Sequence, residues 1–153
     1  MKQLGAVLIA AMMVLMTACS SGNNNSTTDV SGNWTATLTS GNGSSTDAIF
    51  TITLVQNSAG VVSGTNLNFT SGGSCFSSGS TVAGNFSTTG ATGVQSGTLN
   101  LSISTGSNQA LPNLLVMAGT VTSGNTITGT WNFTGTPSCL NGSTAGAFNM
   151  TRS

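Results

Sequence analysis

Apolar residues recur at every second position from Ser31 to the end of the chain. Alternation at period two is typical of a β-strand with one buried face. Clusters of Gly, Asn and Ser separate the runs and favour turns. No segment has the spacing of an amphipathic helix, so the pattern predicts an all-β protein with eight strands. The apolar positions, run by run, are Trp34, Ala36, Leu38; Phe50, Ile52, Leu54; Val61, Leu67, Phe69; Val82, Gly84, Phe86; Leu99, Leu101, Ile103; Leu115, Met117, Val121; Ile127, Trp131, Phe133; and Phe148, Met150.

The two halves of this region resemble one another. Ser31–Leu38 aligns with Ser96–Ile103 at an offset of 65, and Val62–Thr65 aligns with Ile127–Thr130 at the same offset. Each half would have one buried face and two unpaired edges. Joining the halves edge to edge removes all these edges, and short connections favour neighbouring strands. We therefore expect an eight-stranded antiparallel up-and-down meander barrel made of two four-stranded internal repeats.

The N-terminus differs from the rest of the chain. Leu4 to Met16 is an apolar run of thirteen residues, which fits a signal-peptide core and is too short to span a bilayer. It continues into Met16-Thr17-Ala18-Cys19, which resembles a bacterial lipobox. The resemblance implies cleavage after a signal peptide of residues 1–18 and palmitate-type acylation of Cys19. Ser20, rather than Asp, follows the cysteine, which implies export to the outer membrane.

The alternative for this segment is an ordinary signal peptide that leaves Cys19 as a free thiol. Residues 19–30 are polar and lack apolar periodicity, so we expect a flexible tether that is lipidated at its first residue. The barrel domain is then expected over residues 31–153. The lipid anchor would make the membrane a partner without a membrane-spanning helix.

Composition excludes most kinds of chemistry. Ser, Thr, Asn and Gly account for 86 of 153 residues, and the only charged residues are Lys2, Asp29, Asp47 and Arg152. Nucleic-acid binding needs clustered basic residues, which are absent. The chain has no His, no base beside any Ser and no metal-ligand cluster, so we expect no enzyme, no cofactor and no metal. Asp47 is expected to cap a turn.

The remaining cysteines are Cys75 and Cys139. An even pair in an exported protein most often forms a disulfide, whereas a redox or metal role lacks the required neighbours. In an eight-strand meander the third and seventh connections lie at the same end, and these connections hold the two cysteines. The bridge would close 64 residues and contribute about 4 kcal/mol on the chain-entropy model.

Gly32-Asn33-Trp34 resembles the Gly-x-Trp that opens the barrels of the calycin group, the lipocalins and avidins. Ile127-Thr128-Gly129-Thr130-Trp131 is similar to strands of avidin-like barrels. In that group a basic residue of the last strand packs over the tryptophan, which implies this role for Arg152; the alternative is an ordinary end residue. The resemblance also implies an interior that could hold a small apolar ligand, lined by Trp34, Phe50, Ile52, Leu67, Leu101, Trp131 and Phe133.

Two functions therefore compete for a non-catalytic envelope lipoprotein. The first is binding of a small apolar ligand inside the barrel. The second is a structural or adhesive role in which the Thr- and Asn-rich surface contacts glycan, peptidoglycan or another protein. An interior cavity above about 300 Å³ favours the first, and an interior filled by side chains favours the second. A membrane-spanning barrel is disfavoured because the outward positions are polar.

Overall fold

The computed structural model describes residues 29–43, 45–76, 79–88, 96–105 and 112–153. The expected signal peptide, the lipidation site Cys19 and most of the expected tether lie outside these residues. Asp29 and Val30, which we assigned to the tether, are described and are held by the barrel. Val30 is buried, and its carbonyl accepts a hydrogen bond from Trp34 Nε1 at 2.8 Å.

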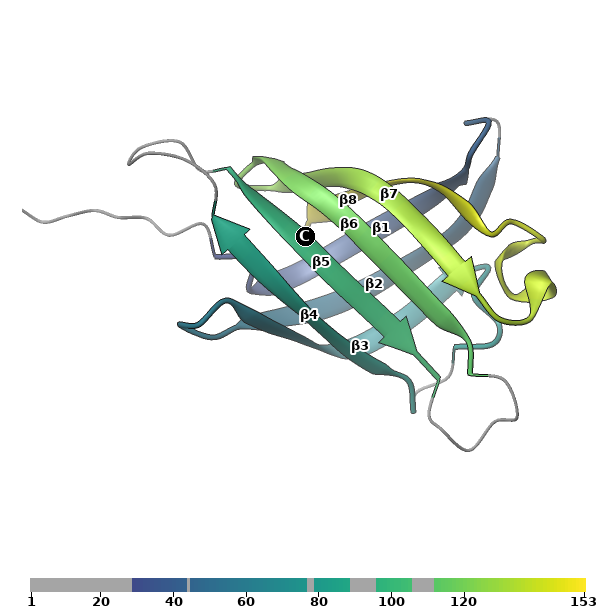
Figure 1. Ribbon diagram of the computed structural model, residues 1–153, viewed down its shortest axis with the longest axis horizontal. Helices are drawn as coiled ribbons and strands as arrows, with labels where there is room; N and C mark the ends of the chain where they lie inside the picture. The colour runs from purple at the N-terminus through teal and green to yellow at the C-terminus, as the bar shows by residue number, and fades with distance from the viewer. Residues whose placement is uncertain (1–28, 44, 77–78, 89–95, 106–111) are drawn as a thin grey trace, which may run out of the picture.

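Eight antiparallel strands form a closed barrel in which every strand pairs with its neighbours in sequence and the last pairs with the first. The predicted all-β, up-and-down barrel is thus confirmed (Figure 1). The strands and one short 3₁₀ helix are β1 (Gly32–Ser40), β2 (Thr46–Gln56), β3 (Val61–Ser71), β4 (Thr81–Thr88), β5 (Gly97–Ser104), β6 (Leu114–Ser123), β7 (Thr126–Thr134), η1 (Pro137–Leu140) and β8 (Ala145–Arg152).

The two sequence repeats correspond to strands that lie four positions apart. Ser31–Leu38 and Ser96–Ile103 contribute β1 and β5, while Val62–Thr65 and Ile127–Thr130 lie in β3 and β7. The four odd-numbered connections, beginning with β1–β2, lie at the end of the barrel that carries η1, which we call the lid end. Asp29 and the β2–β3 turn lie at the opposite end, which we call the N-terminal end.

The alternation places the predicted apolar residues inside in seven of the eight runs, and β3 is the exception. Val62 is buried, whereas the predicted Val61 is 53% exposed. Asn66 has a left-handed backbone conformation (φ 53°), and the register between β2 and β3 shifts beside it. The extra residue of such a bulge reverses which positions face inward. Leu67 and Phe69 therefore point inward with Val62, and Val61 does not.

The outer face of the wall consists mainly of hydroxyl and amide side chains. Aligned registers place Thr51, Thr35, Thr151 and Thr126 in one row across β2, β1, β8 and β7. Within the described residues, no helix has the length and apolar character needed to cross a membrane.

Candidate functional site

The predicted interior residues converge on a single core. Trp34, Phe50, Leu101 and Trp131 are at most 1% exposed, and Leu67 is half-buried and packs against them. The remaining predicted members are also buried: Ile52 and Phe133. Residues from all eight strands contribute to this core.

The interior is filled by these side chains. A side chain beside a cavity that could hold water would keep accessible surface toward that cavity. Phe50, Leu54, Leu115, Ile127 and Trp131 instead keep none. Trp131 lies where Gly146 leaves room for its ring, and its Nε1 donates to the carbonyl of Thr39 at 3.0 Å. The described side chains thus pack the barrel in the manner of an ordinary protein core.

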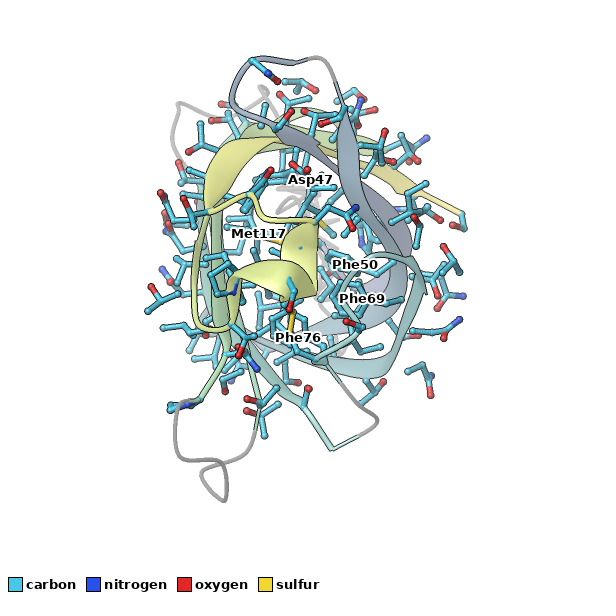
Figure 2. The ribbon with its side chains drawn as sticks, turned by 90° about the vertical axis from the view of Figure 1, so that its right-hand side faces the viewer. Asp47, Phe50, Phe69, Phe76 and Met117 are labelled. Atoms are coloured by element: carbon cyan, nitrogen blue, oxygen red, sulfur yellow. A yellow bond between two sulfur atoms is a disulfide. The ribbon has the colours of Figure 1, made fainter. Side chains whose placement is uncertain are left out.

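The lid end is closed by a covalent link. Cys75 and Cys139 form a disulfide with their Cα atoms 5.3 Å apart, which confirms the predicted bridge. The bridge joins the β3–β4 connection to η1, and Gly73 N–H also donates to the Cys139 carbonyl at 2.8 Å. Figure 2 looks onto this end and shows η1 crossing the mouth of the barrel. We call η1 and the residues up to 144 the lid, and Cys139 and Leu140 within it are buried.

Four phenylalanines form a chain of ring contacts under the lid. Phe69 contacts Phe50 with ring centroids 4.9 Å apart and stacks on Phe76 at 5.2 Å. Phe76 meets Phe133 edge to face at 6.1 Å. Phe76 comes from the β3–β4 connection and is only 7% exposed, so this segment plugs the mouth with an aromatic side chain.

Contrary to our expectation, Asp47 does not cap a turn. The register of β1 and β2 shifts between Leu38 and Thr39, which makes Asp47 an extra residue of β2 and buries it to 2% exposure. Its Oδ1 accepts from Ser143 Oγ at 2.9 Å, and its carbonyl accepts from Asn141 Nδ2 at 3.0 Å. Its Oδ2 has no hydrogen-bond partner among the described residues. Asp47 therefore attaches the lid to β2.

At the N-terminal end Arg152 lies over the ring of Trp34, with its guanidinium carbon 4.9 Å from the ring centroid. Its Nη1 donates to the Ser31 carbonyl at 2.8 Å and its Nη2 to the Asp29 carbonyl at 2.6 Å. Gly32 leaves space for the guanidinium, and its φ of +131° is one that residues with a side chain rarely adopt. Trp34 of the Gly-x-Trp motif is thus covered by Arg152, which is the contact that the resemblance implied. Membership of the calycin group stays a prediction.

Asp29 is anchored in the same cluster. Its Oδ1 accepts from Ser31 N–H at 2.8 Å. Hydrogen bonding to the Ser31 side chain, then to the Ser31 backbone, and the nearby charge of Arg152 hold the pKa of Asp29 below its usual value of 3.8; slight burial opposes them. The carboxylate is consequently ionised at neutral pH.

Beside this cluster the barrel end has an open hollow of about 530 Å³. The β2–β3 turn and the end of β4 form it, together with the start of the described chain. The β2–β3 turn is fixed by Asn57, whose Oδ1 accepts from the backbone N–H groups of Ala59 and Val61. The residues that surround the hollow are Asp29, Gln56, Asn57, Ser58, Ala59, Gly60, Phe86, Ser87 and Thr88.

Several polar groups around the hollow have no hydrogen-bond partner among the described residues and face the space where a ligand could bind. Gln56 uses its Oε1 to accept from Val30 N–H, and within the described residues its amide nitrogen has no partner. The hydroxyls of Ser58, Ser87 and Thr88 also have no hydrogen-bond partner among the described residues. Sequence analysis missed this site because its members come from three segments that are unremarkable in a chain rich in Ser and Asn.

The described residues contain no group of three or more His, Cys, Asp or Glu side chains that could hold a metal ion. Asp29 and Asp47, the two carboxylates, lie near opposite ends of the barrel. Comparison with known proteins finds no family model, no curated protein and no solved structure that matches this chain.

Proposed function

We propose that this protein is a non-catalytic lipoprotein of the cell envelope whose barrel binds a hydroxyl-rich envelope glycan at its polar surface. In this proposal acyl chains on Cys19 hold the protein at the outer membrane, and residues 20–28 connect the anchor to the barrel. The observation that carries the binding proposal is the hollow at the N-terminal end, whose hydroxyl groups and Gln56 amide nitrogen have no partner among the described residues.

The filled interior favours surface binding over the apolar-ligand alternative. An apolar ligand in the barrel needs a concave cavity of about 300 Å³ or more. Leu101, Phe50 and Trp131 occupy that space and leave no accessible surface beyond 1% of each side chain. An apolar guest would have to displace well-packed side chains, which costs free energy.

The hollow has the chemistry that a sugar requires. A sugar presents many hydroxyls that both donate and accept hydrogen bonds. Asp29 supplies acceptor oxygens, the Gln56 amide supplies N–H donors, and Ser87 and Thr88 hydroxyls do both. Phe86 borders the hollow while its side chain is buried in the core, and its backbone N–H donates to the Gly60 carbonyl at 2.7 Å, which fixes this part of the rim. These groups lie on strand ends and a hydrogen-bonded turn, so little ordering is needed on binding.

The outer wall extends the same chemistry. The row Thr51, Thr35, Thr151 and Thr126 presents hydroxyls on four adjacent strands. Neighbouring strands lie about 4.8 Å apart, so such a row spans the length of a few sugar units. A polymer bound in the hollow could therefore continue along the wall.

Titration of ¹⁵N-labelled protein with soluble glycan strands released from peptidoglycan tests the binding proposal. We expect amide shifts at residues 57–60 and 86–88, and none with palmitate. The Ser87→Ala/Thr88→Val variant should weaken binding about tenfold, since it removes two hydrogen bonds. Ser123→Ala/Thr130→Val removes the same groups elsewhere on the wall and should bind as the wild type does. Equal affinity of both variants would contradict the proposed site.

The anchor is tested separately in cells. The wild-type protein should incorporate labelled palmitate and sediment with membranes, because two or three acyl chains hold a protein on a bilayer. Cys19→Ser should abolish both properties and leave the barrel folded. A wild-type protein found in the soluble fraction would refute the anchor and would leave the glycan site untouched.

A further inference from the structure

The barrel is closed between β3 and β4 by a short ladder. These strands pair only from Val61 to Gly64 on β3 and from Val82 to Asn85 on β4. The pairing of β3 with β2, by contrast, extends to Ser71. Figure 1 shows β3 and β4 moving apart toward the lid end. Among the described residues, the stretch 65–71 of β3 is therefore paired on its β2 side only.

No other described segment pairs with this edge. The side-chain bonds of this stretch point back to β2: Asn66 Nδ2 donates to Thr53 Oγ1, and Thr70 Oγ1 donates to the Ile49 carbonyl. After Ser71 the chain turns inward, where Gly72 lies against the backbone of Asp47 and Gly73 lies against the Phe69 ring. Phe76 then fills the inner side of the gap, and the β3 edge remains without a strand partner among the described residues.

An unpaired edge strand is a template for another strand. Natural proteins block such edges with charged side chains, proline or β-bulges. Strand β3 contains no charged residue and no proline over its whole length, and its two bulges, at Asn66 and between Phe69 and Ser71, leave residues 67–69 as regular strand between them. Its inward-facing side instead carries Leu67 and Phe69, both only half-buried, which a further strand would cover.

We propose that two copies of this protein pair through this edge, β3 against β3, in an antiparallel two-fold arrangement. Asn68 is the midpoint of residues 67–69, the regular part of the edge between the two bulges, so a two-fold axis beside it pairs this part with its equivalent in the second copy. In this register Leu67 of one copy lies opposite Phe69 of the other on the same face, and Asn68 lies opposite Asn68 of the second copy. The inference is independent of the proposed glycan function.

Charge favours a second copy over a charged peptide partner. The described charged residues are Asp29 and Arg152 at the N-terminal end and the buried Asp47 at the lid end. The edge itself is uncharged, so an acidic or basic partner finds no complement there. Two copies of this neutral edge approach each other without repulsion and can form an isologous pair.

Cross-linking of the full chain tests the register directly. In the proposed dimer Asn68→Cys places two sulfurs opposite each other at a separation that a disulfide can bridge. Oxidation should give a species of twice the monomer mass on a non-reducing gel. Asn149→Cys is the matched control, since Asn149 is also exposed and lies on a strand that is paired on both sides. We expect about tenfold more dimer from Asn68→Cys; equal yields would overturn the proposal.

Charge substitutions give a second test that does not depend on a thiol. Asn68→Lys alone and Asn68→Asp alone should each abolish dimer formation, because like charges would lie directly opposite. An equal mixture of the two should restore it. Sedimentation of the full chain in detergent measures the dimer, and circular dichroism checks that each variant folds. A wild type that stays monomeric, or single variants that still dimerise, would overturn the proposal.

Discussion

The side chain of Arg152 holds the N-terminal end of the barrel together. Arg152 combines a cation–π contact with Trp34 and two hydrogen bonds to the carbonyls of Ser31 and Asp29. The planar guanidinium can make these contacts together, whereas an ammonium group cannot. The last strand and the first residues of the fold are thereby joined by one side chain.

Replacing Arg152 should separate the contributions of its cation–π contact and its hydrogen bonds to the free energy of unfolding. We expect Arg152→Ala to lower the free energy of unfolding by about 2 kcal/mol, since it removes charge-assisted hydrogen bonds and the cation–π contact. Arg152→Lys should recover only part of that loss. Urea unfolding followed by tryptophan fluorescence measures both, with Thr151→Ala as the exposed neighbour control. If lysine performed as well as arginine, the forked hydrogen bonds would be unimportant.

Asp29 makes the stability of this end depend on acid. Its pKa is lower in the folded chain than the usual 3.8, so its contribution is complete above pH 3.8. The contribution is lost as the pH falls through the folded value. Asp29→Asn should remove this part of the acid-induced loss, and melting temperatures measured between pH 5 and pH 2 should fall less steeply than those of the wild type. Identical pH profiles would show that the hydrogen bonds to Ser31 contribute nothing in solution.

At the scale of elements, the alternation of apolar residues was enough to predict eight strands and their order. The pattern failed where a residue is inserted into a strand. The bulge at Asn66 moved Val61 to the outside, and the extra residue at Asp47 buried a carboxyl expected at a turn. Bulges depend on how two strands pair, so a single strand's pattern does not reveal them.

The lid is the element whose attachment could be predicted, because the repeat places Cys75 and Cys139 in equivalent connections. Removing the bridge with Cys75→Ser/Cys139→Ser should lower the free energy of unfolding by about 4 kcal/mol, mostly by enlarging the unfolded ensemble. Denaturant unfolding of this variant beside the oxidised wild type measures the difference. The reduced wild type is the control and should match the variant. A loss close to zero would mean that the packing of Phe76 and the bonds to Asp47 hold the lid without the disulfide.

At the scale of the whole molecule, the sequence predicted that the barrel closes, but it did not decide whether the interior is a cavity or is filled by side chains. Seven predicted interior residues are consistent with either a cavity or a core. Only the exposed areas of these side chains distinguish the two, because the empty volume inside the barrel depends on how Trp34, Trp131 and the phenylalanines pack against one another. The hollow at the N-terminal end was equally hidden, since it forms between segments distant in sequence, such as Asp29 and Thr88.

A filled barrel should not bind apolar guests unless space is made for them. We expect the melting temperature of the wild type to be unchanged in benzene-saturated buffer. Leu101→Ala should cost about 2–5 kcal/mol by leaving a cavity, and benzene should then raise its melting temperature, as it does for dry apolar cavities of this kind. Leu114→Ala truncates a leucine that is 37% exposed and should respond as the wild type does. Stabilisation of the wild type by benzene would reveal interior space, and the balance between the two functions would move back toward an apolar ligand.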